Sequence, residues 1–451
     1  MLKVILNRYL LFGLLLNLVL ILSLNIDYIY IYIFNIFSLL IYYFVLNSQL
    51  SKPSTYYQSK NLIFNVSLYS IIFVILFNVI SYFYNQNFFV FSEADAVSYH
   101  LYALDMSKDS LQAGIARYFF YGNAFDDLGA VLFITILYKI VASNLFVNLI
   151  YLFSGVLASF YMFRIGRKFM SHKYAFIAAF AYSVSSFVLW FHASGLKESI
   201  LIFFVILTYD QYYEFIAKKK IINIVLLSSS LILLLLFRPA ISFLILMSMF
   251  FSFFVYKRKS LGLILLIPLS SIFIFFTYSY VELLFQNFVG NDLNSLLERK
   301  ESEGMIIISL PMTIATNILA SLIGPIPTII PNSLKTILSF YSIGLILKVL
   351  FSIVSWIGVY FAFKRRFFNL YPLIFFLIFE AVSLSFILEG LELRKSLPHF
   401  FIFYLIAFWF LDYLNKEDSF LLVTKKKVVK LAKFSFFISF ILMIIWNLRT
   451  L

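Results

Sequence analysis

The segment 91–103 holds the densest group of side chains able to do chemistry. It reads Phe-Ser-Glu-Ala-Asp-Ala-Val-Ser-Tyr-His-Leu-Tyr-Ala, so the carboxylates of Glu93 and Asp95 are two positions apart. A carboxylate can remove a proton from a hydroxyl group, and a pair of carboxylates can hold a divalent cation. In an extended backbone, residues i and i+2 project to the same side. Glu93 and Asp95 could therefore face one acceptor hydroxyl or one Mg²⁺ or Mn²⁺ ion.

A helical arrangement of the same segment has a different meaning. Val97, Leu101 and Leu104 recur at helical spacing, which predicts a short amphipathic helix at the membrane surface. On a helix Glu93 and Asp95 would diverge, and Asp95 would cap the helix. The sequence alone leaves both interpretations open for this segment. Asp126 and Asp127, which open the apolar segment 128–142, are interpreted as helix caps.

Basic residues suited to binding phosphate stand at two other places. Arg238 precedes Pro239 between two apolar runs, and Arg394 precedes another apolar run. The guanidinium group is a planar fork of donors that matches a phosphate group, so both arginines are predicted phosphate ligands. Lys197 and Lys395 are interpreted as residues that extend to the membrane–water interface.

The composition places these groups in a membrane protein. Of the 451 residues, 63% are hydrophobic and 12% are charged, and the mean hydropathy is +0.97. A soluble domain is roughly half apolar and a quarter charged, so this chain cannot cover a water-facing surface. There is no cysteine, which excludes disulfides and thiolate chemistry. The four histidines form no HExxH motif, which argues against a zinc site.

Hydropathy predicts an all-α polytopic bundle, because apolar runs near the ~20 residues needed to cross a bilayer recur from end to end. The first two spans form an N-terminal hairpin, residues 1–50, and the remainder, 51–451, forms the main transmembrane domain. The thirteen predicted spans are 4–24, 27–46, 62–84, 146–163, 174–190, 198–216, 221–237, 240–256, 260–280, 340–363, 370–388, 397–413 and 434–448.

Positive charge predicts the orientation of these spans. With the N-terminus in the cytoplasm, the inner segments collect most of the 35 Lys and Arg residues but few of the 21 Asp and Glu residues. The net charge of +14 is thus a topology signal, and anionic lipid headgroups suffice to explain the basic clusters. Nucleic-acid binding is not expected.

The two long connections, near 85–145 and 281–339, fall on the outer side, so function is expected there. Both are too aromatic and apolar for disorder, and loops of this length are usually functional. The chain has no GxxxxGK[ST] or GxGxxG motif, so nucleotide-driven transport and a dinucleotide site lack support.

The stretch from Asp95 to Ala103 resembles the first extracytoplasmic loop of the GT-C superfamily, which includes protein mannosyltransferases and lipid A aminoarabinose transferases. In those families an Asp, often followed by Glu, precedes a Tyr and a small residue at this spacing. Asp95, Tyr99 and Ala103 match the pattern, and Ala96 occupies the position of the second acid.

Three later segments extend this resemblance over about residues 60–410. The run 137–185, with its Gly-Arg turn at 166–167, is similar to the family's second and third spans. Ser-Gly-Leu-Lys-Glu-Ser, ending just after Glu198, is similar to the second outer loop, with Glu in place of the common Asp. The segment 393–399, Leu-Arg-Lys-Ser-Leu-Pro-His, resembles the late outer Arg-Tyr-x-x-Pro loop.

The resemblance implies a multi-pass glycosyltransferase of the cell membrane with an extracytoplasmic site. The donor would be a sugar on a polyprenyl phosphate, and the acceptor a glycan, lipid or protein. Asp95 would act as the base, helped by Glu93, and Glu198 would be the second acid. Tyr99 and His100 would position the substrates, and the outer arginines would stabilise the departing phosphate.

Two other functions stay open. An O-antigen or capsule polymerase or ligase would need outer arginines but no carboxylate base, and Arg299 with the Pro-rich segment 324–331 would suit it. A lipid-linked glycan flippase or other transporter would concentrate charges along a path through the membrane. Glu380 is the clearest intramembrane charge in the sequence, and Lys348 and Lys139 are two further candidates.

Overall fold

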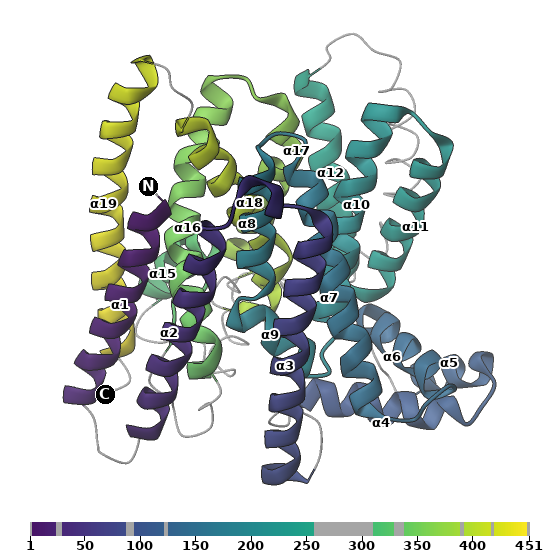
Figure 1. Ribbon diagram of the computed structural model, residues 1–451. Coiled ribbons are helices and arrows are strands. Elements are labelled where there is room, and N and C mark those ends of the chain that lie inside the picture. The colour runs from purple at the N-terminus through teal and green to yellow at the C-terminus, as the bar shows by residue number, and fades with distance from the viewer. Residues whose placement is uncertain are drawn as a thin grey trace.

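A computed structural model describes residues 2–23, 29–86, 94–120, 125–256, 310–328, 338–387, 392–415 and 419–448. Within these ranges every regular element is a helix, as predicted (Figure 1). The longer helices are α1 (Leu2–Ser23), α2 (Ile29–Leu50), α3 (Ser59–Asn85), α4 (Ala94–Ser107), α5 (Leu111–Phe120), α6 (Phe125–Tyr138), α7 (Asn144–Gly166), α8 (His172–Ser183), α9 (Ser186–Ala193), α10 (Glu198–Lys218), α11 (Ile221–Phe237), α12 (Pro239–Tyr256), α15 (Leu310–Ile323), α16 (Leu338–Lys364), α17 (Tyr371–Phe386), α18 (Leu393–Leu414) and α19 (Ser419–Leu448).

Seven helices in the described ranges are long and apolar enough to cross a membrane: α3, α7, α10, α16, α17, α18 and α19. The count becomes eight if α8 and α9 together form one bent span. Helices α11 and α12 are also apolar, but their apolar parts belong to the shorter group of 10–17 residues. Eleven of the thirteen predicted spans coincide with one helix each, the span 174–190 covers the pair α8 and α9, and the span 260–280 lies outside the described residues. The chain therefore has the helices of a multi-pass membrane protein, and thirteen crossings remain a prediction.

The prediction of one continuous helix over 174–190 is wrong. Helices α8 and α9 meet at a bend of 52°. At the junction Ser185 has an extended backbone and its hydroxyl donates to the Tyr182 carbonyl at 2.5 Å. Serine side chains offer the backbone such local alternatives to a regular helix, and three serines stand near this point. The bend directs α9 toward the turn that precedes α10.

The centre of the bundle is α18, because 89% of its apolar window is buried, against 28% in α3 and in α19. The ring of Phe351 on α16 packs between Tyr404 and Phe408 of α18. At Gly358 a Cβ atom would lie 3.0 Å from Ile406, so the glycine lets these two helices approach closely. Central packing of α16 and α18 makes the start of α18 a rigid place for a site.

The carbonyl end of α15 lies beside the middle of α16. Lys348 Nζ and Ser352 Oγ donate to the Ile323 carbonyl at 2.7 and 3.0 Å, and Trp356 Nε1 donates to the Leu322 carbonyl at 2.5 Å. These bonds satisfy carbonyls that the helix itself leaves open. Part of the long 281–339 connection thus packs against a candidate span, while Arg299 and Pro331 lie outside the described residues.

The candidate intramembrane charges have separate local partners. The ammonium group of buried Lys348 also lies 3.9 Å from the centre of the Phe400 ring. Buried Glu380 lies 3.3 Å from His399 Nδ1. Lys139, by contrast, is exposed and donates to the Asp109 carbonyl. Lys139 is therefore apart from the other two, whereas Lys348 and Glu380 contact adjacent residues of α18, Phe400 and His399.

Candidate functional site

Asp95 lies in the first turn of α4. The extended backbone considered for this residue is therefore wrong, because the helix begins at Ala94. The Asp95 side chain is 50% exposed. Glu93 lies outside the described residues, so its suggested role beside Asp95 stays a prediction.

Helix α4 packs on the bundle through one face and leaves two of its leucines exposed. Ala96, Tyr99 and Ala103 are buried, whereas Leu101 and Leu104 are exposed. Helices α4, α5 and α6 lie together at the lower end of the bundle in Figure 1. Exposed leucines at this end fit a helix that contacts lipid, and its membrane-surface position remains a prediction.

Arg394, in the first turn of α18, joins the two acidic segments. Its Nη1 atom lies 2.6 Å from Asp95 Oδ2, and its Nε atom lies 3.2 Å from Glu198 Oε1. Charge-assisted hydrogen bonds of this kind are the stronger ones in proteins. One guanidinium thus links α4 to the start of α10.

Glu198 also binds the second arginine. Arg238 Nη2 lies 3.5 Å from Glu198 Oε1, and Arg238 Nη1 donates to the Arg394 carbonyl at 3.3 Å. The Glu198 carboxylate is fully buried, and its Oε2 atom has no hydrogen-bond partner within the described part of the chain. Asp95, Glu198, Arg238 and Arg394, here called the four-residue cluster, therefore meet at one end of the bundle.

The turn between α9 and α10 brings Glu198 into this position. Gly195 has φ +74°, a left-handed conformation that L residues rarely adopt, and its Cβ would lie 3.0 Å from His100 Nε2. Glu198 then begins α10, where the positive end of the helix dipole favours a carboxylate. A glycine at this turn thus permits close contact between α4 and the start of α10.

Tyr99, Asp127 and Lys197, here called the second group, lie next to the four-residue cluster. Lys197 Nζ pairs with Asp127 Oδ1, and Tyr99 Oη donates to the same oxygen at 2.7 Å. Lys197 is buried, and its ammonium group lies 5.8 Å from the centre of the Tyr99 ring. The interpretation of Lys197 as an interfacial residue is therefore wrong, and Asp127, interpreted as a helix cap, is an ion-pair partner. The one sequence signal that Lys197 belongs to the site was its position directly before Glu198, a predicted site residue.

The pKa values in this second group favour charged Asp127. Burial by itself raises the pKa of Asp127, but the charge and hydrogen bonds of Lys197, with the bond from Tyr99, hold the pKa below its ordinary value. Burial, followed by the charge of Asp127, raises the pKa of Tyr99, so the phenol stays protonated and donates. Burial and the charge of Arg238 lower the pKa of Lys197, and Asp127 opposes them.

His100 directs its Nδ1 side toward α6 and α7 and its Nε2 side toward Gly195. Its Nδ1 atom bonds with Tyr138 Oη, which in turn donates to Asn144 Oδ1. Burial lowers the pKa of His100 to about 4, so the imidazole is neutral at physiological pH. The predicted roles of His100 and Tyr99 in positioning substrate stay predictions, and Tyr99 reaches the second group through Asp127.

Together the two groups contain three carboxylates and three basic side chains. The half-exposed Asp95 can accept a proton, and the two guanidinium groups can bind an oxyanion. A cation beside Asp95 would face the charge of Arg394, and the described residues contain no group of three possible metal ligands. The predicted Mg²⁺ or Mn²⁺ site therefore depends on Glu93 and stays a prediction.

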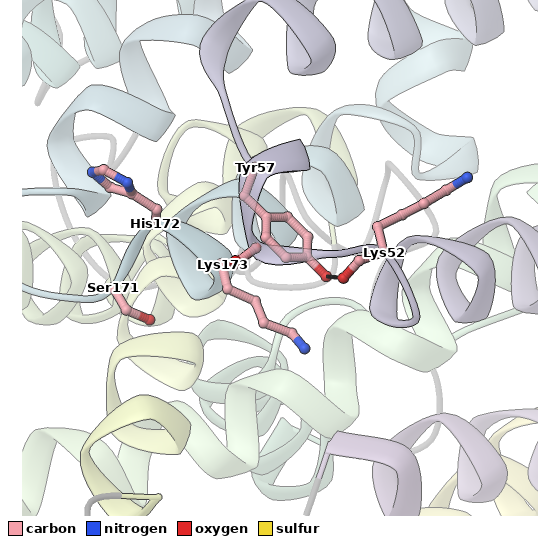
Figure 2. A pocket seen from close by; sticks show the side chains of 6 residues that line it. Lys52, Tyr57, Ser171, His172 and Lys173 are labelled. Atoms are coloured by element: carbon pink, nitrogen blue, oxygen red, sulfur yellow. Dashed lines mark hydrogen bonds between the residues drawn. The ribbon is translucent and has the colours of Figure 1, made fainter.

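The opposite end of the bundle carries a different polar surface (Figure 2). A cavity of about 340 Å³ is lined there by Lys52, Ser54, Tyr57, Ser171, His172 and Lys173. Figure 2 shows Lys52 and His172 on opposite sides of the Tyr57 ring, so their basic groups do not converge. The described lining residues of the cavity are basic or carry a hydroxyl group, and none of them is acidic.

The described ranges also contain an ion-pair network at the far end of α10. Glu214 pairs with Arg164 at 3.4 Å and with Lys168 and Lys218 at 2.5 Å. This network ties α10 to α7 and to the turn between α7 and α8. No protein-family model matches the chain, and no curated protein is significantly similar to it.

Proposed function

We propose that the protein is a membrane glycosyltransferase that uses a polyprenyl-phosphate sugar and an acceptor on the outer side. The observation that carries the proposal is the four-residue cluster. Asp95, Glu198, Arg238 and Arg394 come from three separate helices and one helix junction, yet each lies within hydrogen-bond range of at least one other. A base next to two phosphate-binding forks is the minimum that transfer from a lipid phosphate requires.

In the proposed reaction Asp95 takes the proton of an acceptor hydroxyl group. The acceptor oxygen forms a bond to the anomeric carbon, and the bond from that carbon to the phosphate oxygen breaks. The electron pair leaves with the polyprenyl phosphate. Arg238 and Arg394 stabilise the negative charge on the departing oxygen.

Glu198 has a supporting role in this scheme. Its buried carboxylate holds Arg394 at 3.2 Å and Arg238 at 3.5 Å, so both guanidinium groups keep one orientation. Preorganised donors cost no reorganisation when charge develops. Tyr99 and Lys197 hold Asp127 beside this unit and fix the approach of α4 to α6.

The decisive experiment compares Asp95→Asn with Asp105→Asn in purified protein supplied with a panel of polyprenyl-phosphate hexoses and pentoses. Both acids lie on α4, both are about half exposed, and both pair with an arginine, Arg394 or Arg117. Loss of a general base typically costs about 10²- to 10⁴-fold in rate. We expect that loss only for Asp95→Asn.

Normal transfer by correctly folded Asp95→Asn would contradict the base mechanism. In that case a polymerase or ligase that depends on the outer arginines becomes the better explanation. A protein that moves a lipid-linked glycan across vesicles without releasing polyprenyl phosphate would instead be a flippase.

A further inference from the structure

Arg394 lies between two carboxylates that differ strongly in burial. Glu198 is fully buried, whereas the Asp95 side chain is 50% exposed. Exposed ion pairs contribute about 0–1 kcal/mol, because water screens them. Breaking a buried pair costs several times more, because it leaves an uncompensated charge. Asp95 is therefore the partner that Arg394 can exchange.

The donor atoms support the same distinction. Arg394 directs Nε to Glu198 and Nη1 to Asp95. A phosphate group binds a guanidinium through two parallel N–H donors. Because Nε already serves Glu198, a bidentate phosphate on the outer edge needs Nη1, the atom that Asp95 occupies.

Charge balance gives a second reason for exchange. The four-residue cluster has two carboxylates and two guanidinium groups, so its formal charge is zero. A neutral cluster attracts an anion weakly. Departure of the Asp95 carboxylate from Arg394 leaves one positive charge in excess at the point where the phosphate would lie.

We infer that Asp95 is a displaceable counter-ion of Arg394, and that a lipid-linked phosphate takes its place and thereby frees the carboxylate to act as a base. The displacement of Asp95 by a phosphate group does not depend on the proposed function, whereas the use of the freed carboxylate as a base rests on it. Glu198 keeps both arginines in position during the exchange. The Asp95 carboxylate thus becomes available after the sugar donor has bound. Removal of a proton from the acceptor is therefore disfavoured while no sugar donor is bound.

The test measures binding of undecaprenyl phosphate, without any sugar, to protein in zwitterionic-lipid nanodiscs. If Asp95 competes with phosphate, Asp95→Asn binds the probe about two- to fivefold more tightly, the change expected from loss of an exposed ion pair. Asp105→Asn, whose partner Arg117 lies elsewhere, should leave the affinity unchanged. Arg394→Lys should weaken binding, because the planar fork is lost.

A second measurement uses wild-type protein, so it does not depend on the folding of a variant. Coupling of an amine to Asp95 by a water-soluble carbodiimide should become faster when undecaprenyl phosphate is added, and Asp105 should react at a constant rate. Inorganic phosphate in place of the lipid tests whether the phosphate group alone is sufficient. Unchanged or weaker binding by Asp95→Asn, or protection of Asp95 by the probe, overturns the inference.

The two proposals fail in distinguishable ways. Tighter phosphate binding by Asp95→Asn, without glycosyl transfer by the wild type, would reject the transferase and keep the counter-ion exchange. Transfer that needs Asp95, without any tightening, would reject the exchange and keep the transferase.

Discussion

Asp95 and Arg394 are 299 positions apart in the chain, yet Arg394 Nη1 lies 2.6 Å from Asp95 Oδ2. The contact joins α4, at the end of the bundle, to α18, its most buried span. A half-exposed carboxylate on a peripheral helix is thereby held against the buried centre of the bundle. This arrangement suits a site that must keep its geometry and still admit a substrate.

The Asp127–Lys197 pair should be important for stability. Lys197→Met leaves the Asp127 charge partly buried without its cation, and we expect a loss of about 2–3 kcal/mol. This is below the 3–5 kcal/mol of a fully buried pair, because the Asp127 side chain is 35% exposed. Thermal unfolding in detergent measures the loss.

Two further variants separate the pair from a general effect of removing a lysine. The double variant Asp127→Asn/Lys197→Met should recover part of the stability, since it no longer contains an unpaired charge. Lys395→Met, whose lysine pairs with Glu392 at 3.2 Å near the surface, should change stability by less than about 1 kcal/mol. Equal losses for Lys197→Met and Lys395→Met would contradict the prediction.

His100 should make stability depend on pH. The pKa of its buried imidazole is about 4, against an ordinary value of 6.5, so the unfolded state binds more protons between these values. Its contribution is complete above pH 6.5 and is lost as the pH falls toward 4. The expected loss at pH 4 is about 2–3 kcal/mol.

The measurement compares unfolding temperatures of the wild type and His100→Asn from pH 4 to 8. Asparagine can bond to Tyr138 but does not titrate, so its curve should fall less on the acid side. Other titrating groups are shared by the two proteins and cancel in the difference. Parallel curves over the whole range would argue against the buried neutral histidine.

The orientation predicted from positive charge can be tested directly, because the chain has no cysteine. Ser110, in the turn between α4 and α5, and Ser51, the neighbour in sequence of the cavity residue Lys52, are both exposed. In intact cells an impermeant thiol reagent should label Ser110→Cys and should reach Ser51→Cys only after permeabilisation. Labelling of Ser51→Cys alone would invert the orientation and remove the outer location of the site.

The sequence by itself determined the class of the protein and the places of its helices. Hydropathy and helical spacing are properties of neighbouring residues, so twelve predicted spans coincide with helices in the described ranges. The chemistry of single side chains likewise pointed to Asp95, Arg238 and Arg394, and the family resemblance added Glu198, before any distance was known. The break between α8 and α9 was missed, because the apolar run continues across it while the backbone turns at Ser185.

Only the tertiary structure decided which charges meet. Lys197 had the pattern of an interfacial residue and Asp127 that of a helix cap, yet both are partners in one ion pair. Arg394 could have faced lipid headgroups, but the packing of α18 against α10 directs it to Glu198 and Asp95. A charge selects its partner through distance and burial, which depend on helices remote in the sequence. Local patterns contain no information about those distances, so the pairing could not be predicted from the sequence.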